Sequence, residues 1–477
     1  MKNRQPDPRR AHPRGYARRA TTRGKPWPYA GNLDDRPRGL PVTAYGENVM
    51  AADTMVATSP EALVAHVLRR CAIAPDPQRV ARFTRGASTP QAAATAAIDW
   101  ALQAAPLPIS PAQSRQDGWD DALKGWTGNL RSSGAGLHER MTWFWHNHFA
   151  TSSDKIGNQA MLPRQQQLLR THALGNFATL LRQMTLDPAM LFYLDLAGSS
   201  IEAPNENFAR ELMELYTIGP GNYTEADVKA GALALAGFEV DYDTAAVTKK
   251  PDRSLGGEVV FLGRRGRLGV DDVIDVLLAH EATGPFVASK IYTHLVGVRP
   301  SPERAKQLGQ VLRSSGYEIR PVVENIVRGE EFLGSRMNRP KTAIEWWVGA
   351  VRAIEPFRAD QDKDVRVWIL NDLGQIPHRP PNAAGWPAGP KWLSSDQFVT
   401  RAAYVRSVSW RMEPIKAAPG SDLVAATLAR CSLHEVSGQT MNVLRDAALA
   451  VAGNADELTI SRRLITAALL SPEFSLA

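Results

Sequence analysis

Signals that start and stop helices recur along the chain and predict a fold built almost entirely from α-helices. Ser59-Pro60-Glu61 places a capping hydroxyl group, a proline at the first helical position and an acid in the first turn. Ser301-Pro302-Glu303 repeats this arrangement, and Gly316 provides a stop. The stretch Thr224–Asp227 is typical of a capping box, and Gly237 follows to end that helix. Three further helices are expected at 421–431, 441–452 and 456–470.

Few segments of the sequence favour β-strands. Residues 240–243 and 259–261 alternate weakly in polarity and flank a polar stretch at 244–257, which predicts one small hairpin. No internal repeat with a period of about 20–50 residues is present. We therefore expect a mainly α protein, with a single large multi-helix domain over 49–477, a minor β-hairpin and long Pro/Gly-rich loops.

The formal net charge of +7 is concentrated at one end of the chain. The first 40 residues hold 11 Lys and Arg against 3 Asp and Glu, whereas the other 437 residues hold 45 against 46. A nearly neutral body argues against a broad basic groove for nucleic acid. The segment 1–48 is rich in proline and arginine without apolar periodicity, so we expect it to be disordered. Either it makes a weak electrostatic contact with an acidic protein partner, nucleic acid or anionic lipid, or it has no specific partner.

The expected compartment follows from two missing patterns. No stretch of about 18 consecutive apolar residues is present, so no membrane span is expected. Twin arginines occur at 9–10 and 18–19, but neither pair is followed by the apolar stretch that an export signal requires. The sequence therefore predicts a cytoplasmic protein. Cys71 and Cys431 are too few for a disulfide framework or a Cys-based zinc site, and we expect two buried thiols, with one bridge as the alternative.

The first candidate for chemistry is the aromatic segment 141–149, which contains His146 and His148. Its flanking residues favour a helix, on which side chains two positions apart point about 200° away from each other and cannot share one metal ion. Either histidine could still act with residues from elsewhere in the chain. The alternative is a buried, hydrogen-bonded cluster of aromatic and histidine side chains.

The second candidate is the helix expected over 205–216. Asn205 is placed to cap it, and Glu206 and Arg210 have the spacing of an ion pair on one face. Glu211 lies on a neighbouring face with other polar side chains. Polar groups set so densely beside large apolar ones indicate an enclosed polar face, in which charges need partners. Both a structural network and a functional pocket fit this pattern.

A third candidate is the loop 373–392, in which prolines and glycines exclude regular structure. Asn382 and Trp386 lie on this loop, where they are expected to contact a ligand, although Trp386 could equally anchor the loop against the helices. Lys290 lies within an apolar stripe, and a buried lysine needs a carboxylate or an anionic ligand. The usual motifs of nucleotide-binding proteins, zinc proteases and serine hydrolases are absent, so no cofactor is indicated.

Several short motifs follow one another in a fixed order. They are Leu68-Arg-Arg70, Trp145-His-Asn-His-Phe149, Asp187-Pro-Ala-Met-Leu191, Tyr193-Leu-Asp195, Pro204-Asn-Glu-Asn-Phe-Ala-Arg-Glu-Leu212, Tyr223-Thr-Glu-Ala-Asp-Val228, His280 with Lys290, Pro380-Pro-Asn-Ala-Ala-Gly-Trp386 and Ser471-Pro-Glu-Phe474. With these motifs the sequence resembles a bacterial family, domain of unknown function 1800, over roughly residues 60–477. The resemblance implies a mainly α fold and no established activity. It also implies a His-Asp…Gly-x-Lys segment that the stretch Gly256–Arg267 lacks here, so a site that uses this segment would be altered or lost.

The leading functional hypothesis is an enzyme, or former enzyme, with a polar pocket between helices and either metal-assisted or acid/base hydrolytic chemistry. The alternative is a non-catalytic scaffold or partner-binding protein, in which the same side chains form a structural core network. A third, weaker hypothesis is association with nucleic acid through the basic tail. In the enzyme hypothesis the side chains have these roles: His146 and His148 as acid/base or ligand groups, Glu206 and Glu211 as their carboxylate partners, Arg210 and Lys290 as anion-holding groups, and Asn205, Asn382 and Trp386 as ligand contacts.

Overall fold

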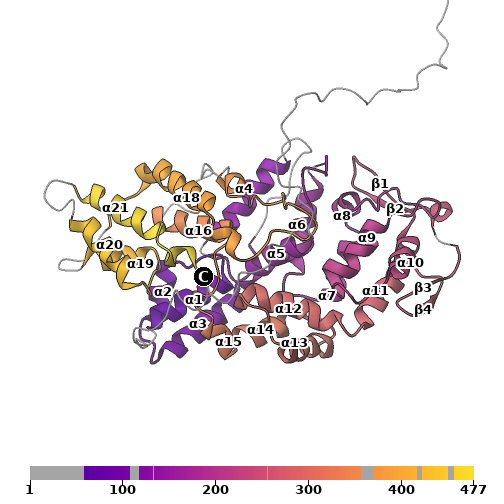
Figure 1. Ribbon diagram of the computed structural model, residues 1–477, viewed down its shortest axis with the longest axis horizontal. Helices are drawn as coiled ribbons and strands as arrows, with labels where there is room; N and C mark the ends of the chain where they lie inside the picture. The colour runs from indigo at the N-terminus through magenta and orange to yellow at the C-terminus, as the bar shows by residue number, and fades with distance from the viewer. Residues whose placement is uncertain are drawn as a thin grey trace, which may run out of the picture. The chain divides into compact units, whose positions relative to one another are not determined.

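The computed structural model of the protein confirms the mainly α fold (Figure 1). It describes residues 59–107, 118–132, 134–158, 160–254, 256–355, 369–415, 422–449 and 456–477. These residues contain 21 α-helices and two small antiparallel strand pairs. None of the described helices is long and apolar enough to span a membrane. The segment 1–48, which we expected to be disordered, lies outside the described residues.

The first half of the chain is helical, and α1, α3 and α6 pack against α5, which carries the two histidines. They are α1 (Pro60–Cys71), α2 (Pro77–Thr84), α3 (Pro90–Gln103), α4 (Gly118–Arg131), α5 (Leu137–His148), α6 (Met161–Thr171), α7 (Phe177–Thr185), α8 (Pro188–Tyr193), α9 (Glu206–Glu211), the π-helix η2 (Leu212–Thr217) and α10 (Glu225–Leu235).

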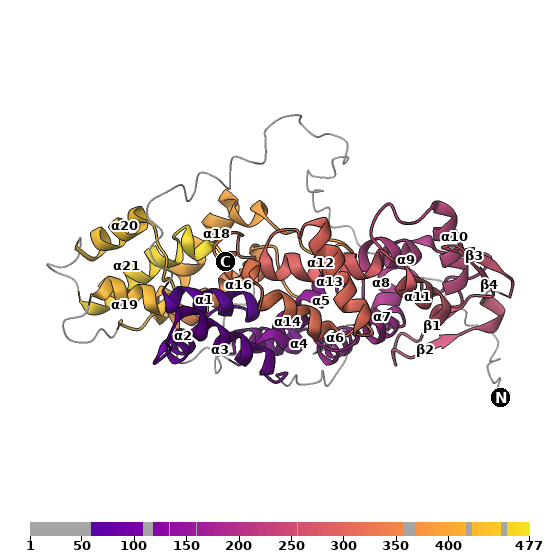
Figure 2. The ribbon, with the colours of Figure 1, turned by 90° about the horizontal axis from the view of Figure 1, so that it is seen from below.

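The second half of the chain is also helical. Its elements are α11 (Val270–Ala279), α12 (Thr283–Val296), α13 (Pro302–Ser314), α14 (Ile319–Val327), α15 (Glu330–Gly334), α16 (Ala343–Ile354), α17 (Ile369–Asp372), the 3-10 helix η4 (Pro390–Leu393), α18 (Ser395–Val408), α19 (Leu423–Arg430), α20 (Gly438–Leu449) and α21 (Glu457–Leu469). Although α1 and α19 are far apart in the sequence, they lie side by side in two views (Figures 1 and 2).

The predicted helix starts are confirmed by their capping hydrogen bonds. The hydroxyl group of Ser59 accepts from the backbone amide of Ala62 at 3.1 Å, and that of Ser301 accepts from Arg304 at 3.1 Å. Thr224 forms the expected capping box at the start of α10. Each such cap satisfies a backbone N–H group that has no partner within the helix, which is why these starts can be predicted locally.

The predicted β-hairpin is wrong in its pairing. The strand β1 (Phe238–Val240) pairs with β2 (Val247–Lys249), while β3 (Val259–Phe261) pairs with β4 (Arg264–Gly266). Two separate hairpins therefore replace the single one expected between 240–243 and 259–261. The second hairpin turns through Leu262 and Gly263, both at positive φ, a two-residue turn that needs no long connection.

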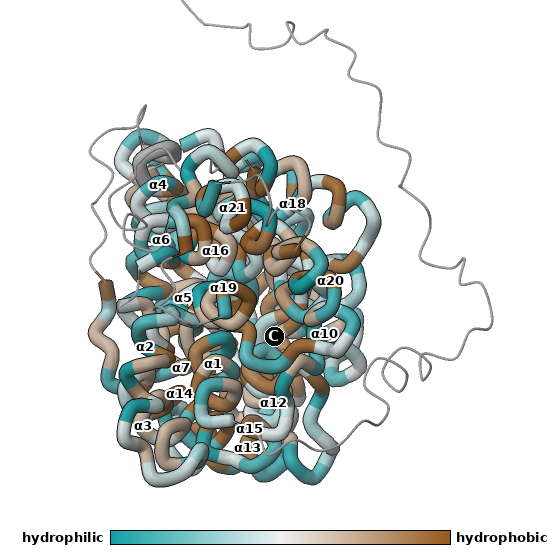
Figure 3. Tube along the Cα trace, turned by 90° about the vertical axis from the view of Figure 1, so that its left-hand side faces the viewer, coloured by the Kyte–Doolittle hydropathy of each residue, from teal (hydrophilic) through white to brown (hydrophobic). Residues whose placement is uncertain are grey.

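The apolar interior of the described residues consists of two large clusters of buried side chains and one small one, and α5 contributes to both large clusters. Trp145 belongs to the first cluster and Trp143 to the second. Hydrophobic and hydrophilic residues alternate along the helices (Figure 3), while α16 is buried along its whole length. Cys71 and Cys431 are free and buried, as expected, and burial raises the pKa of each thiol to about 12.

Candidate functional site

Helix α5 directs its two histidines to different neighbours, as the sequence predicted. The ring of His146 contacts that of His378 on the loop 373–392, with the two ring centroids 5.0 Å apart. The ring of His148 instead packs against Phe149 at 4.6 Å and Tyr216 at 5.7 Å. Both histidines are buried, with exposed fractions of 0% and 3%. They cannot share a ligand, because residues two positions apart lie on opposite sides of a helix.

His146 is one of five side chains that form an aromatic box, the others being Trp126, Trp143, His378 and Trp386. The ring centroid of His146 is 4.7 Å from that of Trp126 and 5.6 Å from that of Trp386. Its Nε2 atom accepts a hydrogen bond from the backbone amide of His378 at 3.1 Å, so its proton is on Nδ1. Burial lowers the pKa of His378 to about 3 and holds the pKa of His146 well below 6.5. The box therefore holds two neutral imidazole rings.

Asn147, between the two histidines, holds the loop 373–392 against α5. Its Oδ1 atom accepts from the backbone amide of Trp386 at 2.7 Å, and the ring of Trp386 stacks on Trp143 at 5.6 Å. Asn382 is exposed, and its Oδ1 atom accepts from the amide of Ala384 at 2.9 Å, which shapes the turn before Trp386. Trp386 therefore both anchors the loop and forms a wall of the box. Sequence reasoning did not select Asn147 or His378, because their roles depend on contacts between distant segments.

Replacing Gly385 by alanine is expected to displace this loop. Gly385 has a φ of +80°, and an added Cβ would collide with the backbone and side-chain oxygens of Asn147. We expect a loss of about 2–4 kcal/mol in the free energy of unfolding, measured by denaturant titration. The control is Gly374→Ala in the same loop, where φ is +71° but no atom lies within 4 Å of the new Cβ. Equal losses for both variants would show that backbone strain alone, rather than the Asn147 contact, sets the cost.

The helix expected over 205–216 begins as predicted but continues as a π-helix. The side chain of Asn205 caps α9 by accepting from the amide of Asn207 at 2.9 Å. From Leu212 to Thr217 the chain has the wider turn of η2, a local distortion frequently found at functional sites. Its last carbonyl groups lack partners within the helix, and Pro220, which follows, has no N–H group to donate.

Two predicted site residues cap the end of this π-helix. Lys290 of α12 donates to the carbonyl oxygen of Leu215 at 3.0 Å, and Nε2 of His148 lies 3.2 Å from the carbonyl oxygen of Tyr216. The Phe286 ring centroid is 5.4 Å from the Lys290 nitrogen, and within the described residues no carboxylate forms an ion pair with it. Burial lowers the pKa of Lys290 to about 8. The chain thus gives this lysine a carbonyl group and an aromatic face in place of the expected carboxylate or anion.

A second group of polar side chains, the tyrosine–glutamate cluster, consists of Tyr193, Glu211, Glu214, Tyr216 and Tyr223. Glu211 is half-buried, and its pKa is raised first by burial and then by the charge of Glu214. Burial, and secondarily the charge of Glu211, raises the pKa of the phenols of Tyr193 and Tyr216. The hydroxyl group of Tyr223 donates to Glu214. Glu211 is therefore a carboxyl group among neutral phenols and beside a second carboxylate.

Arg210 and Glu206 lie beside this cluster in an ion-pair group at the surface. The guanidinium group of Arg210 binds both carboxylate oxygens of Glu225, at 2.7 and 2.9 Å, and approaches Glu206 at 3.4 Å. Hydrogen bonding to Glu225 is the main cause that raises the pKa of Arg210. The predicted Glu206–Arg210 pair is present, and Arg210 has its anionic partners within the chain.

The loop 373–392 is also tied to the segment that follows α5. Arg379 forms an ion pair with Asp154 at 3.0 Å, and the charge of Asp154 contributes to the raised pKa of Tyr193. The predicted site residues thus lie in three groups: the aromatic box, the end of η2, and α9 with its cluster. Among the described residues no three His, Cys, Asp or Glu side chains are arranged to hold a metal ion.

The sequence itself can be compared with those of known protein families. The family described as "Protein of unknown function (DUF1800)" matches residues 40–476, nearly the whole chain. The protein belongs to the DUF1800 family. Neither the curated proteins nor the solved structures include a significant match.

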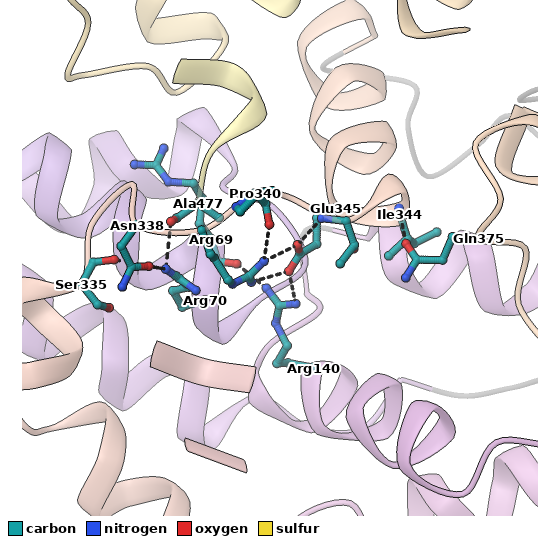
Figure 4. Close-up of polar contacts among 12 residues, drawn as sticks. Arg69, Arg70, Arg140, Ser335, Asn338, Pro340, Ile344, Glu345, Gln375 and Ala477 are labelled. Atoms are coloured by element: carbon teal, nitrogen blue, oxygen red, sulfur yellow. Dashed lines mark hydrogen bonds and ion pairs between the residues drawn. The ribbon is translucent and has the colours of Figure 1, made fainter. Parts of the chain in front are cut away.

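A buried polar and ionic network joins the end of α1 to α5, α16 and Ala477 (Figure 4). Glu345 of α16 binds Arg140 of α5 at 2.5 Å and Arg339 at 2.7 Å. Arg70 at the end of α1 donates to the side chain of Asn338 at 2.5 Å and to the backbone oxygen of Ala477 at 2.8 Å. Burial alone would raise the pKa of Glu345, but Arg339 and Arg140 hold it well below 4.5. Sequence reasoning did not identify this network, since its members are scattered over the whole chain.

Proposed function

We propose that this DUF1800 protein is an enzyme in which Glu211 transfers protons during hydrolysis of a polar substrate. The observation that carries the proposal is the half-buried carboxyl group of Glu211, whose pKa is raised by burial and by Glu214. A carboxyl group with a raised pKa can remain protonated long enough to donate to a leaving group. The π-helix that follows Glu211 is a second feature typical of functional sites.

Two carboxyl groups in different surroundings suit this chemistry. Glu214 accepts a hydrogen bond from the hydroxyl group of Tyr223, while Glu211 lies among phenols without such a donor in the described contacts. In the proposed mechanism Glu211 is the general acid and Glu214 the general base that activates water. Environments that separate the pKa values of two carboxyl groups are the usual way in which one site supplies both roles.

The charge of the site limits the substrate class. Two carboxylates, those of Glu206 and Glu225, already neutralise the guanidinium group of Arg210, and Glu214 adds a further negative charge beside Glu211. An anionic substrate would be repelled by the remaining negative charge. We therefore propose a neutral or cationic substrate. Arg210 then has a structural role in place of the anion-holding role that the sequence suggested.

Replacing Glu211 by glutamine should reduce hydrolysis of the substrate by about 10²–10⁴-fold in kcat/KM, since a positioned acid or base contributes this much. The measurement uses a panel of uncharged chromogenic esters, amides and glycosides. Glu206→Gln, which removes a neighbouring but ion-paired carboxylate, is the control and should change the rate by less than about tenfold. In addition, a carbon-13 NMR titration of the Glu211 carboxyl group should give a midpoint above 4.5. A midpoint at or below that value would refute the proposed acid, whether or not the panel contains a substrate.

A non-catalytic scaffold is the second candidate. It is favoured by one observation: His148, Lys290, Asn205 and Arg210 all make contacts that cap or join helices. In that case no member of the substrate panel would be hydrolysed, and Glu211→Gln would change only the thermal stability.

A further inference from the structure

Large apolar side chains are exposed together on the outer face of α18. Phe398 is 55% exposed, Val399 65% and Trp410 64%, while Leu393, just before the helix, is 48% exposed. We call these four residues the α18 patch. The other large apolar side chains that the described residues expose are distributed over other elements, whereas α18 lies at the periphery of the described residues in two views (Figures 1 and 2). A single exposed apolar side chain is common, but a contiguous group is typical of a binding surface.

The spacing of the helix brings these side chains onto one face. Successive residues of an α-helix are rotated by about 100°, so Phe398, Val399, Arg406 and Trp410 fall within an arc of about 140°. Leu393 precedes the N-terminal cap and Phe398 is the fourth helical residue, which are the two positions of a hydrophobic staple. The opposite face of α18 packs into the protein through buried side chains, those of Gln397, Arg401, Tyr404, Val405 and Val408.

The charges around the α18 patch are mainly positive. Arg406 is exposed in the middle of this face, and within the described residues its guanidinium group forms no ion pair or hydrogen bond. At one end of the patch Arg462 of α21 donates to the backbone oxygen of Trp410 at 3.3 Å, and at the other end Lys391 of η4 is exposed. Between positions 393 and 410 the sequence holds one carboxylate, that of Asp396. The patch is therefore complementary to a surface that offers anions next to an apolar environment.

This charge distribution disfavours a second copy of the chain as the partner. A two-fold contact between two α18 patches would bring two Arg406 side chains together, with no carboxylate in the patch to pair with them. At an anionic lipid surface, phosphate groups pair with Arg406, and the acyl chains below them surround the aromatic and aliphatic side chains. The indole ring of Trp410 suits the boundary between these two layers, because it combines a large apolar body with one N–H group.

We propose that the α18 patch binds the surface of membranes that contain anionic lipids. The helix lies along the surface, with its apolar side chains inserted at the boundary between head groups and acyl chains, and it does not cross the membrane. The sequence offers a second contribution, since residues 1–40 hold 11 Lys and Arg against 3 Asp and Glu. Firm membrane binding commonly combines an inserted apolar group with a polybasic segment. This binding goes beyond the proposed hydrolysis and does not depend on Glu211.

The test measures co-sedimentation of the full chain with phosphatidylcholine vesicles that contain about 30% phosphatidylserine. We expect the chain to bind, and Trp410→Ser should weaken its partition by at least about tenfold, because the largest inserted side chain is removed. The matched control is Val443→Ser, since Val443 of α20 is 53% exposed but lies outside the patch, and binding should be unchanged. Both positions are exposed, so the thermal midpoint should stay within a few degrees. Equal binding of the two variants would overturn the proposal.

Two further measurements separate insertion of α18 from attraction of the basic segment and from self-association. Lipids brominated in their acyl chains should quench the tryptophan fluorescence, and Trp410→Phe should lose most of this quenching. Arg406→Gln should lower the binding several-fold, whereas Arg445→Gln, at an exposed position of α20, should lower it much less. Unchanged quenching in Trp410→Phe would refute the insertion. A dimer that Trp410→Ser abolishes, with vesicle binding unaffected, would assign the patch to a second copy instead.

Discussion

Acidification from about pH 7.5 to about pH 5.5 is expected to remove about 5 kcal/mol from the free energy of unfolding. Four described histidines have almost no exposed surface, and burial is the largest cause that lowers the pKa of each well below 6.5. They are His66, His146, His148 and His378. Because total stabilities are commonly about 5–15 kcal/mol, acid of this strength should bring the protein close to unfolding.

The sign follows from where the protons bind. As the pH falls through 6.5, histidines in the unfolded chain take up protons, whereas the buried ones stay neutral down to much lower pH. The unfolded state then binds more protons, so the stability present above about pH 6.5 is lost progressively below it, by about 1.4 kcal/mol per histidine at about pH 5.5.

Denaturant titrations at several pH values measure this loss. The variant His378→Asn removes one buried imidazole and keeps a residue type that tolerates the positive φ of 61° at this position. It should reduce the pH-dependent loss by about 1.4 kcal/mol. The comparison is His172→Asn, which removes a half-buried imidazole hydrogen-bonded to Gln183 and so separates the effect of full burial from that of losing an imidazole. A stability that stays constant between about pH 7.5 and pH 5.5 would contradict the buried neutral histidines.

Replacing Glu345 by glutamine is expected to cost about 3–5 kcal/mol, because it leaves buried guanidinium groups without their carboxylate. Arg140 and Glu345 have side-chain exposed fractions of 1% and 3%, so water cannot replace the lost charge. Arg339 loses its two charged contacts at the same time. The free energy of unfolding, from denaturant titration at neutral pH, is the measured quantity.

A matched ion pair at the surface is the control. Glu331 binds Arg304 at 3.0 Å, but its side chain is 50% exposed, so Glu331→Gln should cost less than about 1 kcal/mol. If both substitutions had the same small effect, the buried network would carry no more stability than a surface pair, and its cations would have to be balanced in another way.

Several helix starts could be predicted because their signals are local. Ser59 and Thr224 cap helices through atoms only three residues away, so composition at fixed spacing is sufficient. The π-helix after Glu211 could not be predicted, since nothing in a sequence of good helix formers marks the change to a wider turn. The strand pairing failed for a similar reason: the positive φ values of Leu262 and Gly263, which close the second hairpin, are not required by the alternation of polarity.

Less of the candidate site could be predicted. The divergence of His146 and His148 follows from helix geometry alone and is confirmed. The contacts that define their surroundings join residues far apart in the chain: Trp386 meets Asn147 across 239 positions, and Lys290 meets Leu215 across 75. A single sequence contains no signal for such pairings, because they depend on how the helices pack.

The ionic network of Figure 4 has a consequence for synthesis on the ribosome. Arg69 and Arg70 lie in the first described helix, yet they donate to the backbone of Ser432 and Ala477, which are 363 and 407 positions later. Until residues 432 and 477 have been made, these guanidinium groups lack acceptors that the native state gives them. Contacts of such sequence separation slow folding and prolong exposure of incomplete states. We expect α1 to reach its native surroundings only after the segment up to residue 477 has left the ribosome.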